Sequence, residues 1–288
     1  MATNPPVSHI AVLGAGTMGH GIAQVAAASG FATTLYDLDE AALGRARDRV
    51  VANLQAAVTK GKLTALQRDD ALAQLAFSAN LEVAVEQADL IIEAVPESLE
   101  LKAQVFRNCS QVASSHCIYA SNTSSLSLTA LAAATDRPDR TVGMHFFNPP
   151  YVLTLLEIVL AEQTSVETLS VVRVVGDRMG RTQIEVRDSP GFATSRLGVV
   201  IALEAMRMLE QGVASAADID TAMELGYRHP MGPLKLTDLV GLDVRLNIAD
   251  YLHQELGGDQ YKAPQVLRRM VRAGKLGRKS GEGFYKYE

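Results

Sequence analysis

The stretch that decides the fold reads SHIAVLGAGTMGHGIAQVAAASGFATTLYD and covers residues 8–37. It begins with a short apolar segment, 8–14, of the kind that forms a buried strand. Helical patterning follows over 17–29, and a second apolar segment, 32–37, indicates another strand. Strand, helix and strand in this order predict a βαβ unit, the building block of a parallel sheet.

A glycine-rich turn joins the first strand to the helix. Gly14, Gly16 and Gly19 form a G-x-G-x-x-G pattern, which indicates a dinucleotide site when it follows a strand and opens a helix. Gly14 permits the tight turn, Gly16 lets the backbone approach a pyrophosphate, and Gly19 lets helix and strand pack closely. The first amide groups of the helix face the anion. We therefore predict a cofactor site that also includes Thr17 and Met18.

Asp37 ends the second strand, close to the spacing of about 20 residues that the glycine pattern requires. Its carboxylate would accept hydrogen bonds from the adenosine ribose and repel a 2′-phosphate, which favours NAD over NADP. The alternative is a glycine turn that binds nothing. The acidic residue at the expected place favours the NAD site.

Strands and helices alternate beyond this unit. DLIIEAV (89–95) is a continuous apolar run, typical of a strand buried on both faces of a parallel sheet. The pattern predicts further strands at 117–123, 141–147, 154–160 and 181–187, and helices ending near Gly61 and over 64–76, 99–113 and 165–179. It indicates an α/β fold with a Rossmann-like, doubly wound, mostly parallel sheet.

The character of the sequence changes after Asp188-Ser-Pro-Gly191. Only helical patterns follow, over 192–211, 215–225, 233–256 and 263–273. We therefore predict an NAD-binding domain over 1–188 and an all-helical domain over 189–288.

Composition excludes several classes of protein. The chain has 288 residues, 48% of them hydrophobic and 20% charged, as expected for a globular protein with a core. A net charge of −5 argues against a nucleic-acid partner. Cys109 and Cys117 form no metal motif, and no His/Cys cluster predicts a metal site. The first ten residues lack the features of a signal peptide, and the apolar runs 89–95 and 197–203 are too short to span a membrane, so we expect a cytoplasmic protein.

A series of longer motifs resembles one enzyme family. They are GAGTMGHGIA (14–23), IIEAVPE (91–97), SNTSSL (121–126), GMHFFNPP (143–150), LLEIV (155–159), SPGF (189–192), HPMGPLKLTDLVGLD (229–243) and GRKSGEGFYKY (277–287). Together they resemble the L-3-hydroxyacyl-CoA dehydrogenases, particularly the bacterial 3-hydroxybutyryl-CoA dehydrogenases. The resemblance implies oxidation of a (3S)-hydroxyacyl thioester of coenzyme A by NAD, and a homodimer formed partly through the helical domain. Since ligand sites in doubly wound folds tend to lie in clefts, we expect the active site between the domains.

The family's catalytic histidine and glutamate correspond here to His145 and Glu157. The sequence supports this pair independently. If the strands 141–147 and 154–160 are antiparallel around a loop centred near Pro150 and Tyr151, the two residues lie directly opposite each other. A neutral imidazole can take the proton of the C3 hydroxyl, and a carboxylate on its other nitrogen fixes the tautomer and stabilises the imidazolium. A core histidine bonded to backbone is the alternative.

The resemblance also assigns residues on the cofactor side of the site. Ser124 matches the serine beside the substrate hydroxyl and the nicotinamide, with a helix N-cap as the alternative. Asn148 matches a residue near the nicotinamide ribose, with loop geometry as the alternative. Glu97 and Lys102 match cofactor-side positions, with a solvated helix start weighed nearly equally, and Lys279 matches a cofactor contact, with a surface lysine as the alternative.

Three further residues match substrate positions in the family. Lys60 matches a contact to the coenzyme A phosphates and Asn53 a neighbouring contact, and their spacing of two helical turns places them on one face. A lysine near a helix C-terminus is also favourable by itself. Ser195 stands where the family usually has asparagine against the substrate carbonyl. A serine is shorter and offers one donor instead of two, which indicates a water-bridged contact, a slower enzyme or a different acyl group.

Two other functions remain open from the sequence. One is a dehydrogenase of a free 3-hydroxy acid, of the carnitine or gulonate type, which Asn148-Pro-Pro-Tyr151 and Ser195 favour. Lys60 argues against it, because a free acid offers no phosphate to bind. The other is a non-catalytic, crystallin-like NAD-binding protein, which the presence of both His145 and Glu157 disfavours.

Overall fold

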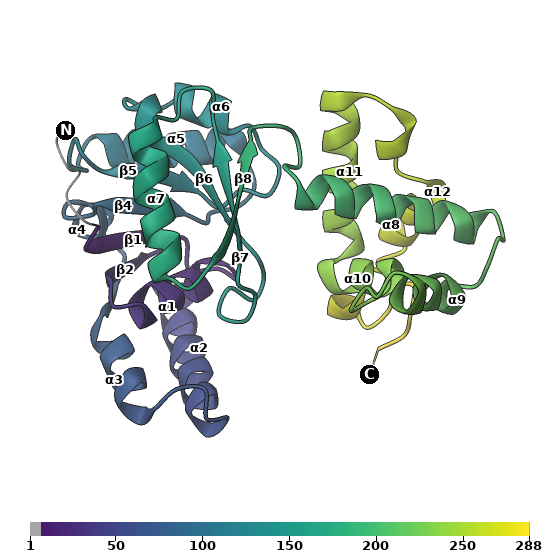
Figure 1. Cartoon of the computed structure of the whole chain (residues 1–288), viewed down its shortest axis with the longest axis horizontal. Helices are drawn as coiled ribbons and strands as arrows, with labels where there is room; N and C mark the ends of the chain where they lie inside the picture. The colour runs from purple at the N-terminus through teal and green to yellow at the C-terminus, as the bar shows by residue number, and fades with distance from the viewer. Residues whose placement is uncertain (1–6, 288) are drawn as a thin grey trace. The chain divides into compact units, whose positions relative to one another are not determined.

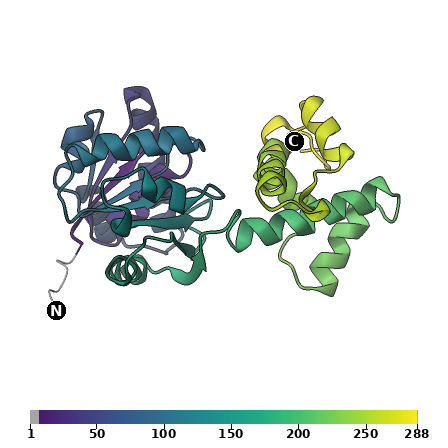
Figure 2. The same cartoon turned by 90° about the horizontal axis from the view of Figure 1, so that it is seen from above.

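The computed structural model describes residues 7–287. Residues 1–6, on which the expectation about a signal peptide partly depends, lie outside this range. The chain divides into two compact units, residues 1–188 and 189–288. Each unit is shown from two directions (Figure 1, Figure 2).

An eight-stranded sheet forms the centre of the first unit, with strand order β3-β2-β1-β4-β5-β6-β7-β8. The strands are β1 His9–Leu13, β2 Ala32–Tyr36, β3 Leu75–Ser78, β4 Leu90–Glu93, β5 Ile118–Ser121, β6 Thr141–Phe146, β7 Leu155–Leu160 and β8 Thr182–Arg187. All neighbours are parallel except β6 and β7, which form an antiparallel pair. The predicted mostly parallel sheet is confirmed. The edge strand β3 was missed, because its half-buried residues follow a helical pattern without a break.

Helices cover both faces of this sheet. They are α1 Gly19–Ala28, α2 Glu40–Thr59, α3 Ala65–Ala73, α4 Leu81–Val85, α5 Leu99–Ser110, α6 Leu128–Ala133 and α7 Val166–Arg178. Successive residues of β1 point to opposite faces: Ile10 and Val12 pack with α1 and α7, and Ala11 and Leu13 pack with α4 and α5. Figure 2 shows the sheet between these layers. The doubly wound fold is therefore confirmed.

The second unit is helical around its own core. Its helices are α8 Thr194–Glu210, α9 Ala216–Thr221, α10 Pro233–Val240, α11 Leu242–Leu256 and α12 Gln265–Arg272, with short helical turns at Ala222–Gly226, Asp259–Tyr261 and Arg278–Ser280. Val199 and Leu203 of α8 meet Leu242 and Leu252 of α11 in its centre. The prediction of one helix over 233–256 is wrong. Gly241 has a φ of 106°, outside the helical range, and separates α10 from α11.

Candidate active site

The glycine turn follows β1 as the sequence predicts. Gly14 has a φ of 104°, and a Cβ there would lie 2.8 Å from the carbonyl oxygen of Ala94 on the neighbouring chain segment. A Cβ on Gly19 would lie 1.7 Å from the oxygen of Gly14. Both positions therefore require glycine. A Cβ on Gly16 would meet nothing within 4 Å, so this glycine faces open space, as a residue that lets a phosphate approach the backbone should.

The end of the turn suits an anion. Thr17 is exposed, Met18 is half-buried, and no side chain caps the first amides of α1. Asp37 Oδ2 accepts a hydrogen bond of 2.7 Å from the backbone nitrogen of Ala15. Asp37 thus also holds the turn itself, a contact that the spacing alone does not reveal. Uncapped amides, an open glycine and a carboxylate at the end of β2 fit NAD.

His145 and Glu157 face each other across the antiparallel pair β6–β7, as predicted. The ring nitrogen Nδ1 of His145 lies 2.7 Å from Oε2 of Glu157. The carboxylate accepts, so Nδ1 carries the hydrogen and Nε2 is the nitrogen that can take a proton. The histidine is 5% exposed and the glutamate 0%, so their attraction is weakly screened by water. The strands approach closely here, since a Cβ on Gly143 would lie 2.7 Å from Cβ of Val159.

The loop after β5 carries Ser124 and is hydrogen-bonded to Glu97. The backbone nitrogen of Ser124 donates to Glu97 Oε1 over 3.0 Å, and its side chain is half-buried. Ser127, and not Ser124, caps α6 by accepting from the nitrogen of Ala130. The N-cap alternative for Ser124 is therefore wrong. Asn122, which the sequence interpretation did not single out, accepts from the backbone nitrogen of Phe146 over 2.9 Å and ties this loop to β6.

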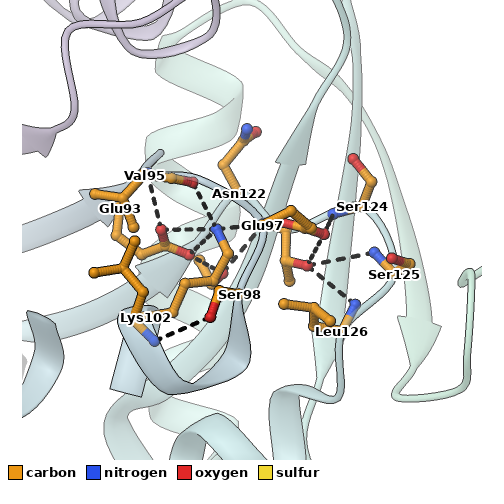
Figure 3. A network of polar contacts seen from close by, with 12 residues as sticks. Glu93, Val95, Glu97, Ser98, Lys102, Asn122, Ser124, Ser125 and Leu126 are labelled. Carbon is orange, nitrogen blue, oxygen red and sulfur yellow. Dashed lines mark hydrogen bonds and ion pairs between the residues drawn. The ribbon is translucent and has the colours of Figure 1, made fainter. Parts of the chain in front are cut away.

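Lys102 is buried, although it lies in the second turn of α5. It is 1% exposed, and its Nζ donates to both oxygens of Glu93 over 2.9 Å and to the carbonyl of Val95 over 3.2 Å. It also lies 3.3 Å from Oε2 of Glu97 (Figure 3). A solvated helix start is therefore wrong for Lys102. Glu93 was not predicted from the sequence, although its place at the end of a buried strand was an available signal.

Burial raises the pKa of Glu93, and the ammonium of Lys102 and the hydroxyl of Ser121 oppose this shift. Glu97 differs, because its side chain is 42% exposed. The network thus runs from a fully buried ion pair to a carboxylate that water and ligands can reach.

The predicted coenzyme A residues lie on α2 and at its end. Asn53 is half-buried and donates to Gln24 Oε1 over 3.1 Å, while Lys60 is exposed at the C-cap. Asn148 is exposed in the β6–β7 loop. Within the second unit, Ser195 is half-buried in the first turn of α8, and Lys279 donates to Asp243 Oδ2 over 2.6 Å.

Two kinds of feature are absent from the described part of the chain. Among residues 7–287, no group of three or more His, Cys, Asp or Glu side chains is placed to hold a metal ion. None of the helices in this range has the length and apolar character needed to cross a membrane.

A doubly wound sheet, a dinucleotide turn and a buried histidine–carboxylate pair are features that an NAD-dependent dehydrogenase needs. Residues 9–189 match the sequence profile of the 3-hydroxyacyl-CoA dehydrogenase NAD binding domain, and residues 191–287 that of the 3-hydroxyacyl-CoA dehydrogenase C-terminal domain. The chain belongs to the 3-hydroxyacyl-CoA dehydrogenase family.

Individual relatives resemble the chain over nearly its whole length. It is 43% identical over 282 residues to the probable 3-hydroxybutyryl-CoA dehydrogenase of Bacillus subtilis, with 98% of each chain covered. It is 40% identical to the human mitochondrial hydroxyacyl-coenzyme A dehydrogenase, with 98% of this chain and 92% of the relative covered. The crystal structure of (S)-3-hydroxybutyryl-CoA dehydrogenase from Ralstonia eutropha superposes with a TM-score of 0.94 at 39% identity, over 98% of this chain and 99% of the other.

Proposed function

We propose that the chain oxidises short-chain (3S)-3-hydroxyacyl-CoA, specifically 3-hydroxybutyryl-CoA, to the 3-ketoacyl thioester, and that the reaction is reversible. The observation that carries this proposal is the buried contact of 2.7 Å between His145 Nδ1 and Glu157 Oε2. The names of the Bacillus and Ralstonia relatives support the short acyl chain. The same names favour a thioester over the free 3-hydroxy acid.

His145 is the general base of the proposed reaction. Its Nε2 takes the proton of the C3 hydroxyl while the hydrogen on C3 departs with its electron pair. NAD, when bound, accepts this hydride. Glu157 keeps the hydrogen on Nδ1 and stabilises the positive charge that develops on the ring. A non-catalytic protein would have no need to bury a carboxylate against this imidazole.

Ser124 completes the proposed catalytic group by donating a hydrogen bond from Oγ to the substrate oxygen at C3. The backbone nitrogen of Ser124 donates to Glu97, which fixes the position of the backbone that carries the Ser124 hydroxyl. Asn148 lies beside the nicotinamide ribose in this proposal, and Ser195 takes the place of the family's asparagine toward the acyl carbonyl.

Cofactor binding in the proposal falls to the glycine turn, Asp37, Glu97 and Lys279. Lys102 belongs to the cofactor side through its ion pair with Glu97. Lys60 meets the phosphates of coenzyme A, and Asn53 lies two turns earlier on α2, where its contact to Gln24 fixes its amide.

The helical unit supports the proposal of a homodimer. Several large apolar side chains on α8 and α10 are exposed, among them Leu197 at 64% and Leu239 at 49%. A second copy of the chain would cover such a surface. Light scattering should give twice the mass of one chain, and Leu197→Glu should lower the measured mass; a monomer at micromolar concentration would contradict the dimer.

We also propose that the enzyme acts in the cytoplasm.

The experiment that tests the function follows NADH absorbance with acetoacetyl-CoA, with free acetoacetate and NADPH as controls. Turnover only with NADH and the thioester, abolished in His145→Ala, is the expected result. It would also show that Ser195 is adequate for the reaction. Absence of thioester turnover despite NADH binding would overturn the substrate proposal, and turnover of free acetoacetate would favour the free-acid alternative.

A further inference from the structure

The buried residue Glu93 has no role in the proposed chemistry, yet its carboxylate accepts four hydrogen bonds from three groups. It ends β4 and is 0% exposed. Oε1 accepts from Lys102 Nζ over 2.9 Å and from the hydroxyl of Ser121, and Oε2 accepts from Lys102 Nζ over 2.9 Å and from the nitrogen of Val95 over 3.2 Å. A carboxylate fully removed from water is tolerated only when it is paired and hydrogen-bonded in this way.

The contacts of Glu93 continue to the loop that carries Ser124. Lys102 Nζ lies 3.3 Å from Glu97 Oε2, and the other oxygen of Glu97 accepts from Thr123 Oγ1 over 2.5 Å and from Ser124 N over 3.0 Å. Figure 3 shows Glu97 between the Glu93–Lys102 pair and this loop.

A second route reaches the loop from the sheet. The hydroxyl of Ser121 donates to Glu93 and accepts from the nitrogen of Thr123 over 3.2 Å. Oγ1 of Thr123 in turn accepts from the nitrogen of Leu126 over 3.0 Å. Besides the tie of Asn122 to β6, two chains of contacts therefore hold the loop 122–126, and both end on the carboxylate of Glu93.

The charges of Glu93, Lys102 and Glu97 explain why removing the charge of Glu93 would move the side chain of Glu97. With Glu93 present, the ammonium of Lys102 is shared between two carboxylates. Without the charge of Glu93, a buried lysine would be left with Glu97 as its single anionic partner. A buried ammonium attracts its one remaining partner strongly, since little water screens the pair. Glu97 would then be drawn from the loop toward Lys102.

We infer that Glu93 is a positioning residue for the dehydrogenase reaction: through Lys102 and Ser121 it fixes Glu97 and the loop that presents the Ser124 hydroxyl. This inference rests on the proposed role of Ser124 in catalysis. It also explains how Lys102 serves the cofactor side although all three of its donors are used by protein oxygens.

The test is Glu93→Gln, which keeps the shape of the side chain and removes its charge, with Glu100→Gln as the matched control. Glu100 is an exposed glutamate in the first turn of the same helix that carries Lys102. Glu93→Gln should lower kcat by roughly tenfold to a hundredfold, the range of one charge-assisted hydrogen bond, with a much smaller change in the KM for the thioester. Glu100→Gln should leave both parameters unchanged.

A merely structural role is distinguished by repeating the change in a Ser124→Ala background. If Glu93 acts through Ser124, Glu93→Gln should cause little further loss of kcat there. An equal loss in both backgrounds would overturn the inference. If Glu93→Gln does not fold, Ser121→Ala weakens the second route with less disturbance, and its loss of kcat should likewise disappear in the Ser124→Ala background.

Hydrogen exchange of the apo-protein gives a readout that needs no turnover. The amides of Ser124 and Leu126 should exchange faster in Glu93→Gln than in the wild type or in Glu100→Gln. Unchanged exchange would overturn the inference even if the enzyme is active. Faster exchange in a chain that does not turn over acetoacetyl-CoA would instead support the positioning network and refute the proposed substrate.

Discussion

Replacing Glu157 by glutamine tests the proposed catalytic pair most directly. The amide oxygen of the introduced glutamine can still accept from Nδ1 of His145, so the change removes a charge and keeps the hydrogen bond. Both groups are buried, at 5% and 0% exposure, and the two polar atoms are 2.7 Å apart. With charge centres about 4 Å apart and an effective dielectric constant of about 20, the attraction between carboxylate and imidazolium amounts to about 4 kcal/mol.

This energy limits the effect on the rate. Each 1.36 kcal/mol corresponds to about tenfold, so complete loss of the attraction would slow proton transfer about a thousandfold. Because the imidazolium is only partly formed in the transition state, we expect kcat to fall by about a hundredfold to a thousandfold. The KM for the substrate should change little, since the carboxylate gains this attraction only as the proton moves to the ring.

The assay is NAD reduction by (3S)-3-hydroxybutyryl-CoA, the direction in which His145 is the proposed base. Glu162→Gln is the control, because Glu162 is exposed just beyond β7. Circular dichroism and the thermal midpoint should show that both variants fold. A folded Glu157→Gln enzyme with kcat within about twofold of the wild type, the scatter of a neutral surface change, would refute the role of the carboxylate.

Three further predictions concern other parts of the chain. Burial raises the pKa of Cys109 and of Cys117 to about 12. Neither thiol should therefore react with a disulfide reagent at neutral pH until the protein is unfolded. Rapid labelling of the native protein would contradict this prediction. Arg245 is 5% exposed, burial lowers its pKa to about 10, and its Nε has no hydrogen-bond partner within residues 7–287. Arg245→Met should therefore raise the free energy of unfolding by about 1 kcal/mol or more in urea titrations. A loss of stability would show that the charge of Arg245 is compensated. Asp37→Asn should weaken NADH binding roughly tenfold to a hundredfold and reduce the preference for NADH over NADPH, as measured by fluorescence titration. An unchanged ratio of the NADH and NADPH dissociation constants would exclude Asp37 from ribose recognition.

Local patterns in the sequence predicted the parts of the fold that depend on neighbouring residues. The glycine turn could be recognised because its three glycines and Asp37 have the spacing of a dinucleotide site within one short stretch of sequence. The facing positions of His145 and Glu157 could be predicted because a short, symmetric loop sets the register of a hairpin.

Other features depend on contacts that no local pattern contains. Lys102 has the pattern of a surface lysine on an amphipathic helix, and only the tertiary structure places Glu93 beneath it. The strand β3 lies at the sheet edge, where half-exposed residues give no continuous apolar run. The break at Gly241 was hidden because apolar residues keep a helical spacing across it.

The β6–β7 hairpin also bears on the order in which the chain folds. His145 and Glu157 are only 12 residues apart, so the loop that joins them closes at a small cost in entropy. The cofactor turn, in contrast, is completed by the parallel pairing of β1 with β4, which brings Leu13 beside Glu93 from a distant part of the chain. Contacts close in sequence form faster than distant parallel pairings. We therefore expect a refolding chain to bring His145 and Glu157 together before it can hold a nucleotide, and a circular permutant opened outside 141–160 to keep that pair intact.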